Sequence, residues 1–344
     1  MKLYSYNTRF APSPTGHMHL GHAFSAIFAS ELAKKINGKF IVRIEDIDQN
    51  RSRKIFEDSI LEDLDWLEIK YDKKVRKQSD HLEDYEAAID ELNRLGVIYP
   101  CFCSRSDIKA EIMRAGNAPH EEENLFYPGT CRRLTNQERI EKLEKENNFA
   151  WRLNIRAAAK KIGRLIWQDI RLGSNTVPVG TIGDVVLARK DIPTSYHLSV
   201  TLDDHIQRIG LVSRGEDLVE ATHIHKIIQM LLGLNTPIYF HHPLILDSTG
   251  KRLSKRNRAQ TLKSLKAKGY KREDIIDLFG RILISTIFLL NGVFKISNYE
   301  GTVDWIESFG IPGILIIPAI ILEIIGPILI IVGYKVKIAA GLLS

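Results

Sequence analysis

Apolar and polar positions alternate with two different periods along the first hundred residues, which predicts strands and helices in turn. Residues 3–10 are mostly apolar and β-prone, and a cluster of Pro12, Pro14 and Gly16 ends that strand. Apolar residues then recur at helical spacing across 23–32, and a short buried strand follows at 40–44. Amphipathic helices are predicted over 55–67 and 82–92. This order predicts an α/β fold with a doubly wound parallel sheet.

The pattern is interrupted between residues 98 and 150 by YPCFCSR, a loop rich in Asn, Pro and Glu, YPGTCR and a charged helix around NQERIEKLEKENN. Alternation resumes at 150–155, GDVVLAR (183–189) reads as a strand, and 218–232 carries a helical stripe. We therefore predict a sheet that is split in sequence. Residues 1–97 form its first half, 98–150 an insertion, and 151–280 its second half.

Residues 281–344 have a different character, dominated by Ile, Leu, Gly and Pro. A 13-residue apolar run at 282–294 is short for a bilayer, whereas the 26-residue run at 309–334 holds one charge, Glu323, and is long enough to span about 30 Å as a helix. A third run, IAAGLLS, ends the chain. Charge placement favours a cytoplasmic side for Lys335 and Lys337 and an outward 295–309 loop. We expect α-helices in this tail and a lipid bilayer as a possible partner.

Net charge and cysteine content narrow the function classes. The chain carries a formal charge of +6 over 344 residues, and residues 281–344 hold four basic and four acidic side chains, so the excess lies in residues 1–280. That excess suggests an anionic partner. Three cysteines exclude a self-contained disulfide framework and fit a reducing compartment or a metal site. The N-terminus lacks the apolar core of a signal peptide, which predicts a cytoplasmic domain.

Two histidines mark the first candidate site, because His19 and His22 fall where a helix is predicted to follow a strand. Free N–H groups and the helix dipole favour an anion there, and two imidazole donors would strengthen phosphate binding. The alternative is that both rings only cap the helix or pack against it. The next strand delivers Glu45, Asp46 and Asp48 at its carboxyl end, the edge at which open α/β sheets bind ligands.

The three cysteines all fall in the insertion, as Cys101, Cys103 and Cys131. Zinc favours a closed tetrahedral set of ligands in structural sites, so a fourth is needed, and Tyr127 and His120 are the candidates. Alternatively, the cysteines are buried free thiols that act as small apolar side chains.

A basic segment, residues 251–272, contains ten basic side chains and no acidic one. Such a run is usually a solvated face. Alternatively, Lys251, Arg252, Lys255 and Arg256 close over a polyphosphate, and the remainder attracts a nucleic-acid backbone in a salt-sensitive manner.

HMHLGH, followed about 230 residues later by RLSKR, resembles the paired signatures of class I aminoacyl-tRNA synthetases. RFAPSPTG and RIEDID are similar to the glutamate-specific branch. YPCFC, YPGTCR, ARKDIPTSYHL and SRGEDL resemble its shortened glutamyl-queuosine subfamily. The resemblance covers residues 5 to about 280 and implies a Rossmann-like catalytic domain with a zinc-bearing insertion.

The resemblance implies that glutamate is activated by ATP as glutamyl-adenylate and then transferred to queuosine in the anticodon of tRNA(Asp). It implies Mg²⁺ bound with ATP, a structural Zn²⁺, and a monomeric enzyme. The positions that match the family's site residues fall into three groups. They are His19, His22, Arg252, Ser254 and Lys255 for ATP, with His19, His22 and Lys255 catalytic; Arg9, Ala11, Ser13, Glu45, Tyr196 and Arg214 for glutamate; and Cys101, Cys103, Tyr127 and Cys131 for zinc.

Two positions depart from the family pattern. Arg252 stands where the family usually has Lys, and IQRIGLVSRG lacks the Thr-His pair often found before this Arg-Gly. Only about 25 soluble residues follow Lys255, where a glutamyl-tRNA synthetase continues into an anticodon-binding domain; this favours modification of the anticodon base over charging of a tRNA 3′ end.

The tail resembles the N-terminal half of the DoxX family of membrane proteins, through GRILIS, NGVFK and Glu323. We expect residues 281–344 to tether the catalytic domain to the inner membrane or to destabilise it, without contributing chemistry. Two other interpretations are a membrane-tethered non-catalytic relic and a nucleotidyl transferase of the same fold.

Overall fold

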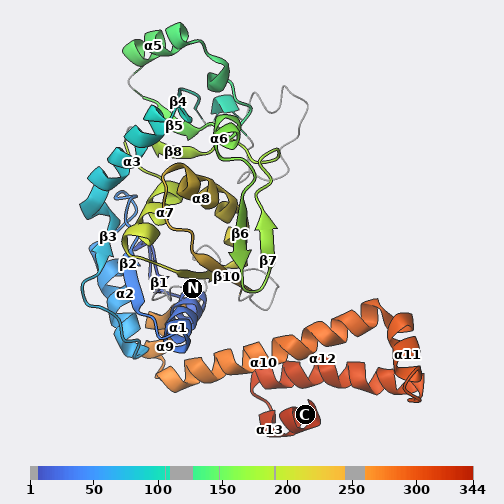
Figure 1. Cartoon of the computed structure of the whole chain (residues 1–344). Coiled ribbons are helices and arrows are strands. Elements are labelled where there is room, and N and C mark those ends of the chain that lie inside the picture. Colours follow the sequence, from blue (N-terminus) through green and yellow to red (C-terminus); the bar gives the residue numbers. More distant parts are fainter. Residues whose placement is uncertain are drawn as a thin grey trace. The chain divides into compact units, whose positions relative to one another are not determined.

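The computed structural model describes residues 7–104, 106–108, 127–146, 148–189, 191–244 and 260–343. The chain divides into two compact units, Met1–Lys263 and Ser264–Ser344 (Figure 1). The sequence analysis placed this division at 280/281, a position that falls inside a continuous helix.

The first sheet of the N-terminal unit is parallel, and it is built from β1 (Thr8–Phe10), β2 (Phe40–Ile44) and β3 (Arg76–Lys77). Its helices are α1 (Leu20–Lys35), α2 (Lys54–Trp66) and α3 (Leu82–Arg94). The predicted order of two strands and three helices in residues 1–97 is confirmed, whereas β3, between the second and third helices, was not predicted. Each connection returns over the sheet through a helix, as parallel strands require.

A second sheet has the order β7-β6-β10-β9, in which β6, β10 and β9 are parallel and β7 is antiparallel. Its strands are β6 (Ile166–Asp169), β7 (Gly173–Thr176), β9 (Leu211–Gly215) and β10 (Ile238–His242). A parallel bridge between Asn7 and Ile209 joins the start of β1 to the chain just before β9. The carboxyl ends of β1 and β9 therefore lie at the same edge.

The third sheet corrects the predicted course of the chain. β4 (Ile98–Cys101), β5 (Ala150–Leu153) and β8 (Val186–Arg189) form an antiparallel sheet of their own. The sequence analysis assigned β5 and β8 to the second half of the parallel sheet. Instead, β5 pairs with β4, so the two ends of the insertion lie side by side in one sheet. The predicted 150/151 boundary falls inside β5. Antiparallel neighbours need no crossover helix, which explains the pairing.

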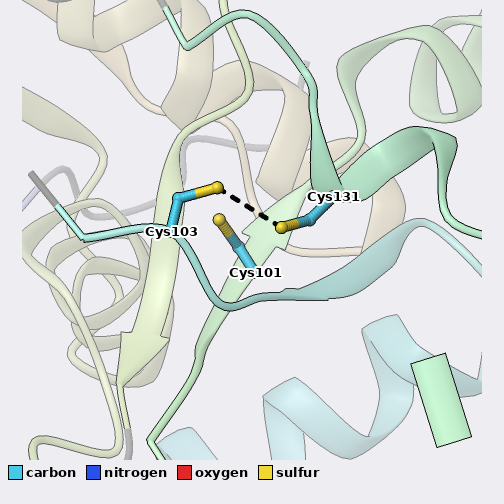
Figure 2. Close-up of side chains that lie close together, drawn as sticks. All are labelled: Cys101, Cys103 and Cys131. Carbon is cyan, nitrogen blue, oxygen red and sulfur yellow. Dashed lines mark hydrogen bonds between the residues drawn. The ribbon is translucent and has the colours of Figure 1, made fainter. Parts of the chain in front are cut away.

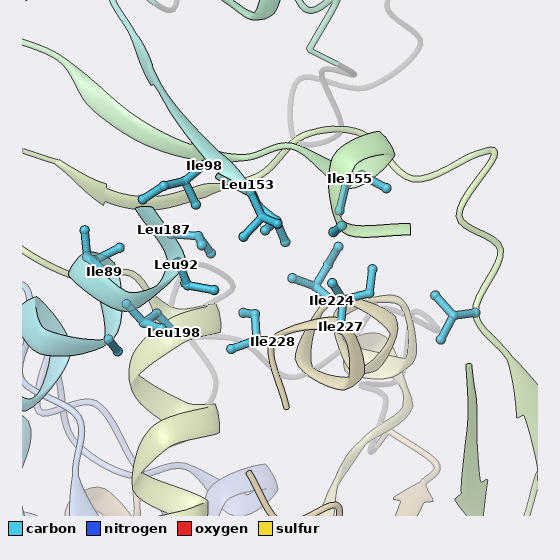
Figure 3. Close-up of a cluster of buried hydrophobic side chains, with 14 of the residues drawn as sticks. Ile89, Leu92, Ile98, Leu153, Ile155, Leu187, Leu198, Ile224, Ile227 and Ile228 are labelled. Atoms are coloured by element: carbon cyan, nitrogen blue, oxygen red, sulfur yellow. The ribbon is translucent and has the colours of Figure 1, made fainter. Parts of the chain in front are cut away.

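The main hydrophobic core lies among α3, the β4-β5-β8 sheet and helices α6 (Ile155–Ile162), α7 (Tyr196–Ile206) and α8 (Val219–Leu231). Figure 3 shows Leu92, Leu153, Leu187 and Ile227 from four of these elements pointing into the same volume. Trp167, 1% exposed, is among the largest buried side chains. Outside the core, α5 (Asn136–Lys145) is the predicted charged helix, and α9 (Leu262–Ala267) lies within the basic segment.

The C-terminal unit is helical. It contains α10 (Arg272–Ser297), α11 (Tyr299–Glu307), α12 (Ile316–Val332) and α13 (Val336–Leu343), and α10 packs against α12. The 295–309 segment, expected as a loop, is mostly helical. Among the described residues, one helix is long and apolar enough to cross a membrane: Gly313–Val332, with a mean hydropathy of 2.8.

Candidate active site

A buried network of charges occupies the carboxyl ends of β1 and β2, where it meets α7. Arg9 Nε lies 3.2 Å from Asp204 Oδ1, and its Nη1 donates to the Ser213 carbonyl at 3.1 Å. Arg43, which has no exposed surface, donates to the same Asp204 atom at 2.9 Å and to Glu45 Oε1 at 3.2 Å. Arg9 and Glu45, both predicted site residues, thus belong to one network through Asp204 and Arg43.

In this network the two guanidinium groups of Arg9 and Arg43 offset the two carboxyl groups of Asp204 and Glu45. Burial opposes ionisation of Asp204, but the guanidinium groups of Arg9 and Arg43 hold its pKa below the usual value. Burial raises the pKa of Glu45 above its ordinary value, and Arg43 and Arg9 oppose that rise. A carboxylate in this setting is held by cations on one side and can accept a further cation on the other.

Arg214, at the end of β9, is 5% exposed and surrounded by hydrogen-bond partners. Its Nη1 lies 3.2 Å from the Tyr196 hydroxyl and 3.3 Å from His225 Nδ1, and its Nη2 donates to Thr222. Its Nε lies 3.2 Å from His241 Nε2. The structure therefore brings together Tyr196 and Arg214, which the sequence predicted as parts of one pocket.

The two groups are linked through β9, because the Ser213 carbonyl that Arg9 contacts directly precedes Arg214. Arg9 and Arg43 are paired with carboxylates of the protein, whereas the hydrogen-bond partners given above for Arg214 are hydroxyl and imidazole groups. Asp203, the other buried acid beside Arg43, also receives a 2.9 Å bond from Arg76. Arg214 therefore differs from Arg9 and Arg43, because its charge can meet a carboxylate supplied by a ligand.

Ala11 and Ser13 lie on the turn between β1 and α1. The carbonyl of Pro12, between them, accepts a 3.0 Å hydrogen bond from the Glu45 backbone N–H. This bond fixes the turn against the carboxyl end of β2. Ala11 is half-buried and Ser13 is exposed.

His19 and His22 do cap the helix, as one of the two predicted alternatives requires. His19 Nδ1 accepts from the Gly21 N–H at 3.1 Å, and His22 Nδ1 accepts from the His19 N–H at 3.2 Å. The two rings lie 3.8 Å apart, centroid to centroid. Nδ1 of each ring accepts a backbone hydrogen bond in the cap. In a neutral imidazole the proton then lies on Nε2, which is a donor.

Arg252, Ser254 and Lys255 lie outside the described residues, but the chain on both sides of them contacts α1. His242, before them, lies 3.3 Å from Ser25 through Nε2. After them, Thr261 bridges to His19 and the Leu262 N–H donates to the Met18 carbonyl at 2.8 Å. The chain on either side of these three residues is thereby attached near the start of α1.

The cysteines of the insertion gather at one point, with the sulfur atoms of Cys101, Cys103 and Cys131 all within 4.8 Å of one another (Figure 2). The Tyr127 hydroxyl lies 3.4 Å from Cys101 Sγ and 3.6 Å from Cys103 Sγ. Zinc–sulfur bonds of about 2.3 Å place tetrahedral sulfurs about 3.8 Å apart. Three thiols and a phenol oxygen at these separations fit that geometry, and His120 lies outside the described residues.

The thiols differ in acidity. A hydrogen bond from Cys101 lowers the pKa of Cys131 to about 7, and burial with the bond to Cys131 raises the pKa of Cys101. One of the sulfurs is therefore close to ionisation at neutral pH, the form in which a thiol binds a metal.

The chain was compared with known proteins. Residues 5–311 match the family model described as "tRNA synthetases class I (E and Q), catalytic domain". The chain belongs to this family. The synthetase is therefore a ligase, and its mixed α/β unit is the class I catalytic fold.

Among curated relatives, the synthetase is 44% identical over 285 residues to a glutamyl-Q tRNA(Asp) synthetase of Rhodobacter capsulatus, covering 79% of this chain and 99% of the relative. It is 37% identical to a glutamate–tRNA ligase of Hydrogenobaculum, of which it covers 55%. Among solved structures, a glutamate tRNA ligase from Elizabethkingia meningosepticum in complex with its amino acid superposes with a TM-score of 0.68 at 26% identity. The alignment covers 80% of this chain and 60% of that one, so the synthetase spans little more than half of these ligases.

Sequence reasoning missed several buried residues of the synthetase's site: Arg43, Asp204, His225, His241 and Thr222. In RIEDID only the acidic residues were considered as site candidates, although its first residue, Arg43, donates hydrogen bonds to both Glu45 and Asp204. His241 lies near the end of β10, at the edge where Arg214 lies near the end of β9, but nothing in the sequence shows that these two strands pair. The parallel register places His241 directly opposite Arg214.

Proposed function

We propose that this synthetase activates L-glutamate with ATP and transfers the glutamyl group to the queuosine base in the anticodon of tRNA(Asp). The observation that carries the proposal is Arg214, a buried guanidinium whose hydrogen-bond partners are hydroxyl and imidazole groups, beside the network that joins Arg9 to Glu45. Glutamate has a net charge of −1 and presents two carboxylates and one ammonium group. Arg9 and Arg214 would take the carboxylates, and Glu45 with the Tyr196 hydroxyl would take the ammonium group.

In the first step, an oxygen of the glutamate α-carboxylate attacks the α-phosphorus of ATP. The bond between that phosphorus and the bridging oxygen breaks, and pyrophosphate leaves. In the second step, a hydroxyl of the queuosine cyclopentene ring attacks the activated carbonyl carbon, and AMP leaves. The substrate is its own nucleophile, so the protein acts by positioning the reactants and stabilising charge.

His19 and His22 would donate to the ATP phosphates, because the cap leaves their Nε2 atoms as donors. Lys255, with Arg252 and Ser254, would hold the departing pyrophosphate; the attachment of His242 and Thr261, on either side of these residues, near the start of α1 supports this role. Mg²⁺ bound with ATP would neutralise charge on the phosphate oxygens. Zn²⁺ held by Cys101, Cys103, Tyr127 and Cys131 would fix the insertion without taking part in the reaction.

The identity of the acceptor rests on the relatives. The glutamyl-Q relative matches at 44% identity over 99% of its length, against 37% for a glutamate–tRNA ligase matched over 55% of its length. The alternative function is charging of a tRNA 3′ end, which the name of the second relative supports. A non-catalytic relic is disfavoured because the glutamate-binding positions retain their charged groups.

The decisive experiment is glutamate-dependent ATP–pyrophosphate exchange, followed by transfer of labelled glutamate to tRNA(Asp) with and without queuosine. We expect exchange without tRNA and labelling only of the queuosine-containing tRNA. Equal labelling of queuosine-free tRNA, or labelling of tRNA(Glu) at its 3′ end, would overturn the assignment of the acceptor. No exchange with glutamate would overturn the proposal entirely.

We further propose that residues 281–344 hold the enzyme at a lipid bilayer. The Gly313–Val332 helix supports this, as do exposed apolar side chains along the unit, including Phe294 (64%) and Ile314 (69%). Lys295 on α10 and Glu323 on α12 form an ion pair, with Lys295 Nζ 2.6 Å from Glu323 Oε1. Pairing of this kind is how ionisable groups are accommodated within a bilayer.

Flotation of the full chain with vesicles of neutral and anionic lipid tests the tether, and light scattering of the lipid-free truncated chain tests whether the enzyme is a monomer. A chain ending at Gly280 should stay with the soluble fraction and keep its exchange activity. Recovery of the full chain away from vesicles would refute the tether. Loss of exchange after truncation would show that the tail contributes to the catalytic unit.

A further inference from the structure

We propose that His241 is a positioning residue for glutamate: its Nε2 accepts a hydrogen bond from Arg214 Nε and so sets the direction in which the guanidinium faces the substrate carboxylate. The inference rests on the proposed function, because it assigns a role to a residue behind the predicted glutamate site. His241 has no exposed surface, so it cannot reach the substrate itself.

The proton on the His241 ring is assigned by its two neighbours. Its Nδ1 lies 2.7 Å from Asp169 Oδ2, a carboxylate that accepts hydrogen bonds, so the proton resides on Nδ1. Nε2 then carries a lone pair, faces Arg214 Nε at 3.2 Å and lies 3.1 Å from Thr222 Oγ1, a hydroxyl that can also donate to it. The guanidinium can only donate, so this tautomer is the one that fits both neighbours.

Asp169 is itself held in place, which makes it a fixed anchor. Its Oδ1 accepts from the backbone N–H groups of Arg171 and Leu172, each at 2.8 Å, and its Oδ2 also accepts from the His241 N–H at 3.0 Å. Burial opposes ionisation of this carboxyl, but these donors keep its pKa below the ordinary value. Asp169, His241 and Arg214 therefore form a chain of hydrogen bonds that runs across β6, β10 and β9.

The ring is also fixed by packing. It lies parallel to the Tyr239 ring, with centroids 5.7 Å apart, and meets the Trp167 ring edge-on at 5.6 Å. The β9–β10 register sets His241 opposite Arg214. A rotation of the imidazole would break its contacts with Asp169, Arg214 and Thr222, so one ring orientation is favoured.

The arrangement needs a neutral imidazole. A protonated ring would have no lone pair for Arg214 and would add a positive charge beside it. Burial, together with the charge of Arg214, lowers the pKa of His241 to about 4, although Asp169 opposes the shift. The ring therefore remains neutral at physiological pH.

A purely structural role would predict a different outcome in steady-state kinetics. Loss of packing alone would lower stability or kcat without selecting one substrate. Loss of a positioning contact behind Arg214 would weaken the binding of glutamate in particular. ATP would be affected less, because in the proposed function it binds at α1 and the basic segment. The ratio of the two KM values therefore separates the two roles.

The test compares three full-length variants in glutamate-dependent ATP–pyrophosphate exchange. His241→Phe keeps a ring but has no acceptor, and should raise KM for glutamate about tenfold while KM for ATP changes less than about twofold. His241→Gln places an amide oxygen near the Nε2 position and should recover most of this loss. His223→Gln is the matched control: His223 is also buried and contacts Trp167, but the Trp167 indole N–H donates to it at 3.0 Å and it makes no contact with Arg214.

Equal changes in both KM values, no change with His241→Phe, or no difference between the Phe and Gln variants would overturn the inference. If the Phe variant does not fold, ¹⁵N NMR of the wild-type histidines decides. A neutral His241 protonated at Nδ1 supports the inference, and a ring that is charged or protonated at Nε2 refutes it. Absence of exchange in the wild type would instead refute the proposed function.

Discussion

The Oδ1 atom of Asp204 lies 3.2 Å from Arg9 Nε. The arginine predicted to bind a carboxylate of the substrate is therefore already held by a carboxylate of the protein. Arg43 shares the same oxygen atom at 2.9 Å. Part of each guanidinium is committed to the protein, which fixes where the remaining N–H groups point. Preorganisation of this kind reduces the cost of ordering the side chain when the ligand binds.

Replacement of Asp204 by Asn should therefore affect both stability and glutamate binding. It leaves two buried guanidinium groups without their shared counter-charge, and removal of one partner from a buried ion pair costs about 3–5 kcal/mol. Chemical unfolding measures the loss, and exchange kinetics should show a higher KM for glutamate. Asp84→Asn is the control, because Asp84 is 43% exposed and pairs with Arg76 at the surface, where about 0–1 kcal/mol is expected. Equal losses in the two variants would contradict the assigned role of Asp204.

Acidification should destabilise the protein through its buried histidines. Burial and Arg214 lower the pKa values of His197 and His241 to about 4, whereas an unfolded histidine titrates near 6.5. Between these values the unfolded chain binds more protons than the native one, so stability is lost as pH falls from about 6.5 towards 4. Linkage gives a loss of about 2–4 kcal/mol between pH 7 and 5 for the two groups together. Unfolding curves at the two pH values measure it, and His241→Gln should reduce the slope.

Tyr127→Phe should weaken zinc retention while leaving the surrounding packing in place. The ring would keep its stacking with Arg152, which lies 4.0 Å from the ring centroid, but the fourth ligand would be lost. Changes outside the first ligand sphere already cost 10–100-fold in affinity, so the loss of a ligand should cost at least about tenfold. Competition with a chelator measures this. Tyr99→Phe is the control, since the Tyr99 hydroxyl donates to Asp184 and not to a sulfur. Equal zinc affinity in the wild type and the Tyr127 variant would exclude Tyr127 as a ligand.

Lys255→Gln should slow the exchange reaction about 10²-fold with little change in stability. The variant removes a positive charge that would stabilise the negative charge developing on the departing pyrophosphate. Lys263 is an exposed lysine on α9, and Lys263→Gln should leave kcat within about twofold of the wild-type value. Steady-state exchange rates at saturating glutamate and ATP compare the two. A similar small effect in both would favour the solvated-surface interpretation of the basic segment.

The sequence predicted most N-terminal strands and helices well, because Pro12, Pro14 and Gly16 end the first strand and apolar residues recur at helical spacing in α2 and α3, whereas the two-residue β3 carries no such pattern. It misassigned β5 and β8, since four-residue strands carry too little pattern to show which sheet they join. The glutamate-binding residues were found through the family resemblance, and their charges agree with the geometry. Asp204 and His241 were missed because a buried polar residue is recognised by its partners, and those partners lie far away in sequence: Arg43 is 161 positions before Asp204, and Asp169 is 72 positions before His241.

The pairing of β9 with β10 also limits how this enzyme can change during evolution. Inserting a single residue within β10 would move His241 to the opposite face of the sheet and set a different side chain beside Arg214. The turn at 233–237 before β10 has no such restriction, because surface connections tolerate added length at a small entropic cost. Variation in length among descendants of this chain should therefore accumulate in that turn, while the number of residues between Ile238 and His242 stays constant.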